Sequence, residues 1–157
     1  MKKTNLTDLL IFIISAELVG AISALLSGNF SGFYAEIIKP PLSPPGFVFP
    51  VVWAVLYAAM GFSAYLIYSE EDYGSERRLS LGLYVIQLAI NFLWSIVFFR
   101  FRLFSGAVVV AVMLWIALAT MILAFRKVKP TAALINLPYL IWVTFAVYLT
   151  IGVFILN

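Results

Sequence analysis

Five long apolar runs, separated by short polar breaks, dominate the hydrophobic pattern of this 157-residue chain. A helix needs about 20 mostly apolar residues to cross the hydrocarbon core of a bilayer, and each run meets that length. The last four runs contain no Asp, Glu, Lys or Arg, and Glu17 lies within the first. The pattern predicts an all-α integral membrane protein, a five-transmembrane-helix bundle that forms a single domain over residues 1–157. The predicted helices span residues 6–26, 47–69, 79–99, 103–125 and 131–155.

The longest break, residues 27–46, is the only connection long enough to fold over one end of the predicted bundle. Its second half, Lys39–Gly46, contains four prolines, which remove backbone donors and fix φ, so we expect a stiff, extended connector there. Long loops in compact domains are often functional lids. The remaining breaks, residues 70–78, 100–102 and 126–130, are short polar loops, and short connections predict antiparallel neighbours.

Composition narrows the class of protein further. Apolar residues make up 64% of the chain and charged residues only 11%, too few for a soluble domain of this size to cover its surface. An ordinary soluble enzyme and a basic nucleic-acid binder are therefore excluded, and no nucleic-acid partner is expected. The chain has no Cys and no His, so the usual zinc ligands, thiol nucleophile and axial haem ligands are missing from the sequence.

The positive charges are unevenly divided between the two ends of the predicted bundle. Five spans place the chain termini on opposite sides, and cytoplasmic loops of membrane proteins are enriched in Lys and Arg. This rule predicts a cytoplasmic N-terminus, an outward-facing long loop and a location in the cell membrane. One side carries Lys2, Lys3, Arg77, Arg78, Arg126, Lys127 and Lys129, and the other carries Lys39, Arg100 and Arg102.

Polar and aromatic side chains share one face of the third predicted helix. Gln87, Asn91, Trp94 and Phe98 recur at spacings of four, three and four residues, which places them on the same side of a helix. An amide within a bilayer needs a partner, so this face is expected to point inward. Two interpretations remain open and are compatible: hydrogen bonds that join helices, or the wall of a cavity in which amides orient a ligand and aromatic rings stack on it.

Two further helices add aromatic residues with helical spacing. Trp53 and Tyr57 lie four residues apart in the second span, and Pro138, Tyr139, Trp142 and Ala146 lie in the fifth. Trp and Tyr often form belts at membrane interfaces. Packing is the other common role, but together with the amides these rings indicate a site for a flat aromatic ligand.

Small residues also recur in the first span. Ala16, Gly20 and Ala24 are spaced by four, a pattern that permits close contact between helices, either within the bundle or in a homodimer.

Three segments of the chain resemble the translocator protein family (TspO/MBR, tryptophan-rich sensory proteins, or peripheral benzodiazepine receptor family). They are Tyr34-x4-Lys39-Pro40-x3-Pro44-Pro45-Gly46-x2-Phe49-x3-Trp53-x2-Leu56-Tyr57-x2-Met60-Gly61, Gly82-Leu83-Tyr84-x2-Gln87-x3-Asn91-x2-Trp94-Ser95-x2-Phe98-Phe99 and Pro138-Tyr139-x2-Trp142-x2-Phe145-Ala146. The resemblance implies a five-helix bundle that binds porphyrins, chiefly protoporphyrin IX, and isoquinoline- or benzodiazepine-type drugs, and that is often dimeric. The ligand-binding positions it indicates here are Tyr34, Pro44, Trp53, Tyr57, Gln87, Asn91, Trp94, Trp142 and Ala146. The helix faces add Phe98, Pro138 and Tyr139 to the candidate ligand-binding residues.

Three functions remain open at this stage. The first is a receptor or binding protein for porphyrins, with a sensory or tetrapyrrole-handling role. The second is light- and oxygen-dependent porphyrin degradation, for which the resemblance makes Trp53 and Trp142 the candidate residues. If the chain does not carry out this reaction, we expect no enzymatic activity. The third is a transporter of porphyrins or other apolar ligands. Lys39 is a candidate partner for a porphyrin propionate, and the absence of His and Cys favours a metal-free porphyrin as ligand, with no cofactor.

Overall fold

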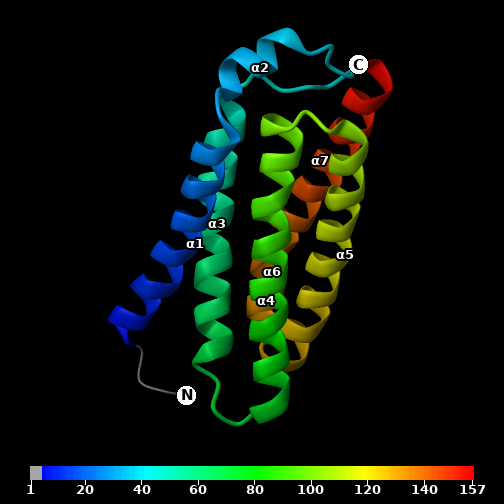
Figure 1. Cartoon of the computed structure of the whole chain (residues 1–157). Helices are drawn as coiled ribbons and strands as arrows, with labels where there is room; N and C mark the ends of the chain where they lie inside the picture. Colours follow the sequence, from blue (N-terminus) through cyan, green and yellow to red (C-terminus); the bar gives the residue numbers. More distant parts are fainter. Residues whose placement is uncertain (1–4) are drawn as a thin grey trace.

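Five long helices run side by side in the computed structural model, which describes residues 5–157 (Figure 1). Within these residues there is no strand, and all five helices are long and apolar enough to cross a membrane. The predicted all-α, five-helix architecture is therefore confirmed. The long helices are α1 (Leu6–Ser27), α3 (Val48–Tyr68), α4 (Gly74–Ser95), α5 (Phe104–Val128) and α7 (Leu137–Leu156), and the short elements are α2 (Phe30–Glu36), α6 (Pro130–Ile135) and the π-helical turn η1 (Ile96–Arg100).

The middle helices extend into segments expected to be polar loops. Helix α4 begins at Gly74, five residues before the predicted start at residue 79. Glu76 lies in its first turn, where a carboxylate is favoured by the helix dipole, and Arg77 Nη1 donates to the carbonyl of Glu70 at 3.0 Å. Helix α5 continues to Val128, past the predicted end at residue 125, because Arg126 and Lys127 suit the negative C-terminal end of a helix.

The fifth span is interrupted near its start, whereas one continuous helix over residues 131–155 was expected. Helix α6 ends at Ile135, and α7 begins at Leu137 with Pro138 in its first turn, where a missing N–H is tolerated. Asn136 at the break is fully buried. Its Nδ2 donates to Ser63 Oγ on α3 at 2.8 Å and to the carbonyl of Ala132 at 2.9 Å. The break therefore fixes the fifth span against α3.

The long helices form a closed ring. Helix α1 packs along α3, α3 meets α6, α7 and α6 pack on α5, α5 packs on α4, and α4 with η1 returns to α1. Close approach of α1 and α3 depends on small residues, because a Cβ at Gly61 would stand 2.6 Å from the carbonyl oxygen of Phe12. Ala16 is fully buried, and Gly20 lies against the ring of Tyr57. The small-residue face of α1 thus packs inside the bundle.

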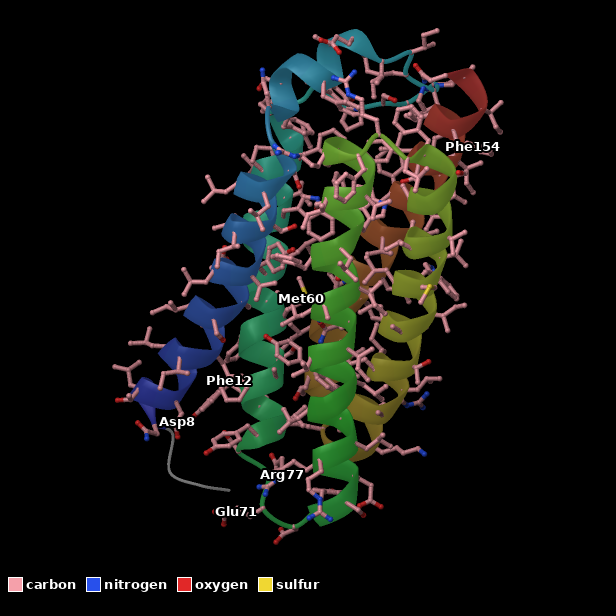
Figure 2. All side chains as sticks on the ribbon, in the orientation of Figure 1. Asp8, Phe12, Met60, Glu71, Arg77 and Phe154 are labelled. Atoms are coloured by element: carbon pink, nitrogen blue, oxygen red, sulfur yellow. The ribbon has the colours of Figure 1, made fainter. Side chains whose placement is uncertain are left out.

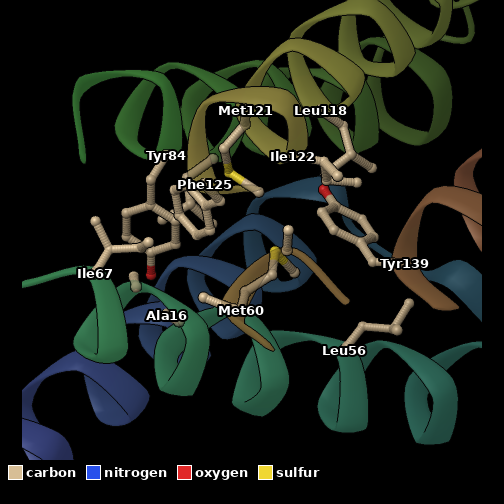
Figure 3. Close-up of a cluster of buried hydrophobic side chains, with 14 of the residues drawn as sticks. Ala16, Leu56, Met60, Ile67, Tyr84, Leu118, Met121, Ile122, Phe125 and Tyr139 are labelled. Carbon is tan, nitrogen blue, oxygen red and sulfur yellow. The ribbon is translucent and has the colours of Figure 1, made fainter. Parts of the chain in front are cut away.

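The apolar core and the apolar surface are separate. Buried side chains from α3, α4, α5 and α7 interlock around Met60, as Figure 3 shows for Leu118, Met121 and Tyr139. Large aliphatic side chains also cover the outside of the spans, for example Leu25 at 80% and Ile141 at 71% exposure. Soluble proteins rarely expose so much contiguous apolar surface, so the outside of the bundle is a lipid-facing surface.

Helix α2 and the connector after it cross one end of the bundle (Figure 1). We call residues 28–47 the cap segment. The Asn29 side chain caps α2 by accepting from the Gly32 N–H at 3.1 Å, and residues 37–46 contain no helix. The connector is tied to α7: Asn157 Oδ1 accepts from Ile38 N–H at 3.0 Å, Asn157 Nδ2 donates to the Ile38 carbonyl at 2.9 Å, and Tyr148 donates to the Pro41 carbonyl at 2.8 Å.

Charged side chains gather at the end of the bundle opposite the cap segment. Arg77, Glu71 and Asp8 lie at the end opposite the cap segment, whereas Phe154 lies near the cap end (Figure 2). At the uncapped end, Lys129 and Glu70 form a partly buried ion pair that joins the α5–α6 junction to the end of α3. Lys2 and Lys3, which contribute to the predicted orientation, lie outside the described residues.

Candidate functional site: an aromatic cavity beneath the cap segment

A cavity of about 200 Å³ lies beneath the cap segment, between α1, α3 and the end of α4. Its wall on α1 consists of small residues, and the opposite walls are mainly aromatic. Gly20 and Ala24 add almost no volume on one side, which leaves room between α1 and the aromatic rings. We call it the aromatic cavity, lined by Gly20, Ala24, Ser27, Phe30, Phe49, Pro50, Trp53, Tyr57, Trp94, Ser95 and Phe99.

A smaller pocket of about 40 Å³ adjoins it under the connector. The two spaces share four wall residues, Phe30, Phe49, Trp94 and Phe99. These aromatic side chains form a wall common to both spaces, so movement of the rings would bring the two spaces together. The predicted residues that line this cap pocket are Tyr34, Lys39, Trp94, Phe98 and Ala146.

Aromatic contacts hold the cap segment on the cavity. The Phe30 ring stacks on Tyr34 with centroids 5.5 Å apart, and both rings meet Phe49 edge-on, at 5.6 and 5.4 Å. The Tyr34 hydroxyl donates to the carbonyl of Pro44. Burial raises the pKa of Tyr34 above its ordinary value of 10.0, which keeps this hydroxyl a donor further into the alkaline range. Tyr34 and Pro44, both predicted from sequence, thus close the cap segment on itself.

The polar face of α4 divides into two halves with different roles. Gln87 and Asn91 are fully buried and hydrogen-bond to Tyr139 on α7: Tyr139 donates to Gln87 Oε1 at 2.8 Å and accepts from Asn91 Nδ2 at 2.9 Å. Neither amide lines the aromatic cavity or the cap pocket. Trp94 and Phe98, further along the same face, do line these spaces and stack on each other at 5.4 Å. The two amides therefore join α4 to α7 by hydrogen bonds and face no cavity, whereas Trp94 and Phe98 form cavity wall.

The two candidate tryptophans lie in different places. Trp53 lines the aromatic cavity and contacts Tyr57 at 5.7 Å. Trp142 and Pro138 instead line a separate apolar crevice of about 470 Å³ between α3 and α7. The nearest link is Phe49, whose ring lies 5.9 Å from Trp142 and also lines the cavity. The structure thus places Trp53 in the cavity and Trp142 behind its wall.

Lys39 is engaged with the backbone of the cap segment. Its ammonium donates to the carbonyl of Tyr34 at 2.8 Å and to that of Ile37 at 3.5 Å, and it lies 4.9 Å above the Tyr34 ring. Since an ammonium has three donors, a third remains for a ligand.

Several wall residues were not among the ligand-binding positions expected from the sequence, although Phe49 and Phe99 lie in the segments that resemble the family. Phe49 lies four residues before Trp53, so helical spacing could have found it. Phe30 lies in the cap segment, where no periodicity exists. Phe99 follows Trp94 by five residues, and it joins the same walls because the helix becomes a π-helical turn at Ile96–Arg100.

Fold and cavity together define a multi-pass integral membrane protein with five helices and an aromatic interior space beneath a loop. Residues 11–156 match the model of the TspO/MBR family. The chain belongs to this family, which confirms the resemblance drawn from its motifs.

Relatives with known names cover most of the chain. It is 39% identical to the translocator protein of Ovis aries over 125 residues, 79% of this chain and 74% of that protein. It is 35% identical to the tryptophan-rich protein TspO of Chlorobaculum tepidum over 127 residues, 81% and 80% of the two chains. It is 31% identical to the protein CrtK of Rhodobacter capsulatus over 153 residues, 98% and 94% of the two chains.

Proposed function

We propose that this protein is a membrane receptor for porphyrins, with protoporphyrin IX as the representative ligand, and that the aromatic cavity holds the ring. The observation that carries the proposal is the cavity wall: Trp53, Tyr57 and Trp94 come from two helices and bound one space. Aromatic faces suit a flat, apolar macrocycle through offset stacking. Trp94 Nε1 is buried without a partner among residues 5–157, so it is available to donate to a bound ligand.

The cap segment has to move when a ligand of this size binds. Pockets for drug-sized ligands enclose roughly 300–1,000 Å³, more than the cavity of about 200 Å³. Displacement of Phe30 and Phe49 would merge the cavity with the cap pocket. In this proposal the cap segment is a lid, and isoquinoline- and benzodiazepine-type ligands, which are smaller and carry aromatic rings, would occupy the same space. Protoporphyrin IX is a ligand here, not a cofactor.

The proposal also covers the orientation of the protein in the membrane and its assembly into a homodimer. Among residues 5–157, Lys39, Arg100 and Arg102 belong to the cap end, and Arg77, Arg78, Arg126, Lys127 and Lys129 to the other. The excess at the uncapped end supports a cytoplasmic N-terminus and an outward-facing cap in the cell membrane. The homodimer stays a prediction.

A titration with matched tryptophan variants tests the binding proposal. Protoporphyrin IX is added to detergent-purified protein in the dark, and tryptophan quenching and the Soret band are followed. Trp53→Phe removes part of the cavity wall, and we expect about fivefold weaker binding, since the loss of ring contact costs about 1 kcal/mol. Trp142→Phe should weaken binding less. Trp115→Phe is the control, because Trp115 is exposed on α5, hydrogen-bonds Thr144 of α7 and lines no part of the cavity.

Two further measurements separate the alternative functions. Loss of the Soret band under light and oxygen, with a new product and with dependence on Trp53 and Trp142, would favour porphyrin degradation. Uptake into proteoliposomes that exceeds binding stoichiometry would favour a transporter. Absence of saturable binding to folded wild-type protein would overturn the receptor proposal.

A further inference from the structure

A second, polar space opens beside the aromatic cavity. It has a volume of about 220 Å³ and lies between the end of α1, the cap segment and the residues that follow α4. We call it the basic groove, after Arg100 and Arg102. Its polar lining residues are Ser27, Asn29, Glu36, Arg100 and Arg102.

Among residues 5–157, one basic side chain at this end of the bundle lacks a partner. Lys39 donates to two carbonyls, and Arg102 pairs with Glu36 at 3.0 Å and lies over the Phe33 ring. The Arg100 side chain makes no hydrogen bond or ion pair with any other residue in the range 5–157. Since its guanidinium keeps its charge and presents five donors in a planar fork, it is free to bind an anionic group.

Local backbone geometry places Arg100 at the groove. The π-helical turn Ile96–Arg100 closes with the Phe101 N–H donating to the Ile96 carbonyl at 3.1 Å. Turns of this kind shift the register of the following side chains and often occur at functional sites. Arg100 Nη1 lies 3.9 Å from where a Cβ of Gly28 would stand, and Gly28 has a φ of +87°, which favours glycine.

The groove and the aromatic cavity have a common wall. Ser27 and Phe99 line both spaces, so a ligand ring in the cavity would lie one side chain away from the groove. A porphyrin of the protoporphyrin type carries its two carboxylates on short flexible chains at one edge of the ring. With the ring stacked on Trp53 and Trp94, that edge can face Arg100.

We propose that the basic groove is the carboxylate subsite of the ligand site, and that Arg100 binds a propionate of the ligand through a charge-assisted hydrogen bond. The inference rests on the proposed porphyrin-binding function and adds to it a selection for ligands that carry an acidic edge. Because Arg100 is exposed at the membrane surface, a lipid phosphate is the competing occupant with the same charge.

A pair of ligands that differ only in charge tests this assignment. Protoporphyrin IX and its uncharged dimethyl ester are titrated against wild-type protein and Arg100→Gln in an uncharged detergent. We expect Arg100→Gln to bind the diacid about five- to tenfold more weakly and the ester within twofold of wild type. Arg100→Lys keeps the charge without the fork and should recover part of the affinity. Arg126→Gln removes the same charge from the uncapped end, and it should change neither ligand.

The outcomes separate the subsite from the binding function. Equal affinity of wild type and Arg100→Gln for the diacid would overturn the subsite and leave the cavity intact. An equal loss for both ligands would also overturn it, because Arg100 would then act on the shape of the site. If Arg100→Gln binds the diacid more weakly than wild type in detergent but equally in nanodiscs that contain phosphatidylglycerol, a lipid phosphate occupies the groove in the membrane, and the subsite assignment is overturned there. Failure of both ligands to bind wild type would refute the binding function itself.

Discussion

The contact between α1 and α3 allows a matched test of how closely the helices pack. Gly61 is buried in the middle of α3, and a Cβ added there would stand 2.6 Å from both Phe12 O and Ile13 Cα. Both neighbours are backbone atoms of α1, so they can move away only if the helices separate. Gly82 is also inside a helix, α4, but is exposed, and nothing lies within 4 Å of an added Cβ.

The expected energies follow from these surroundings. Replacing a helical glycine by alanine stabilises a helix by about 0.5–1 kcal/mol, and this gain applies to both sites. Overpacking a close contact costs about 1–3 kcal/mol, and this cost applies only at Gly61. We therefore expect Gly82→Ala to stabilise the protein by about 0.5–1 kcal/mol and Gly61→Ala to destabilise it by about 1–2 kcal/mol.

Unfolding in mixed micelles measures both variants. Purified protein in a mild detergent is titrated with sodium dodecyl sulfate, and helicity is followed by circular dichroism. Comparing the two variants cancels the propensity gain and isolates the clash. If Gly61→Ala is as stable as Gly82→Ala, α1 and α3 do not approach as described, and the account of the small-residue face is wrong.

Three further predictions concern the cavity, the amide network and the lid. Gly20→Ala should weaken protoporphyrin IX binding about three- to tenfold in the quenching titration, because a Cβ there would overlap the Tyr57 ring and push it into the cavity; unchanged affinity would contradict the cavity geometry. Tyr139→Phe should lower the free energy of unfolding by about 2–3 kcal/mol in the micelle titration, since it leaves Gln87 Oε1 and Asn91 Nδ2 buried and unpaired. Tyr148→Phe loses an exposed hydrogen bond and should cost below about 1 kcal/mol. Equal costs for the two variants would refute the network. Asn157→Ala should speed amide hydrogen exchange in residues 37–46 without changing exchange in α3, because it removes both hydrogen bonds to Ile38. If exchange changed equally in both regions, the lid would not open as a separate unit.

Much of the fold follows from the apolar runs alone, because a bilayer leaves helices with satisfied backbones as the only option for such segments. Helix ends were less predictable. The polar residues before residue 79 read as a loop, yet Gly74–Arg78 is helical because a helix can extend beyond the membrane into water. The break at Asn136 depends on Ser63 of another helix, a tertiary contact that no local pattern contains.

For the candidate site as well, spacing within one helix was predictable from the sequence, and contacts between helices were not. Helical spacing correctly grouped Gln87, Asn91, Trp94 and Phe98 on one inward face, but it could not tell which half meets Tyr139 and which meets the cavity. Trp142 has the spacing of a wall residue and lies behind Phe49, because the position of α7 relative to α3 is set by packing.

The walls of the aromatic cavity come from two helical units that meet late along the chain. One unit is the α1–α3 hairpin, which supplies most of the wall, and the other is the group of α4, α5 and α7, which supplies Trp94, Ser95 and Phe99. The hairpin is complete before the second unit has been synthesised, so the binding space arises only when the two units dock. A ligand that binds only the docked form stabilises it by RT ln(1 + [L]/Kd). For the proposed receptor, the ligand would therefore act as a brace between the two units, and its effect on stability would grow with its concentration.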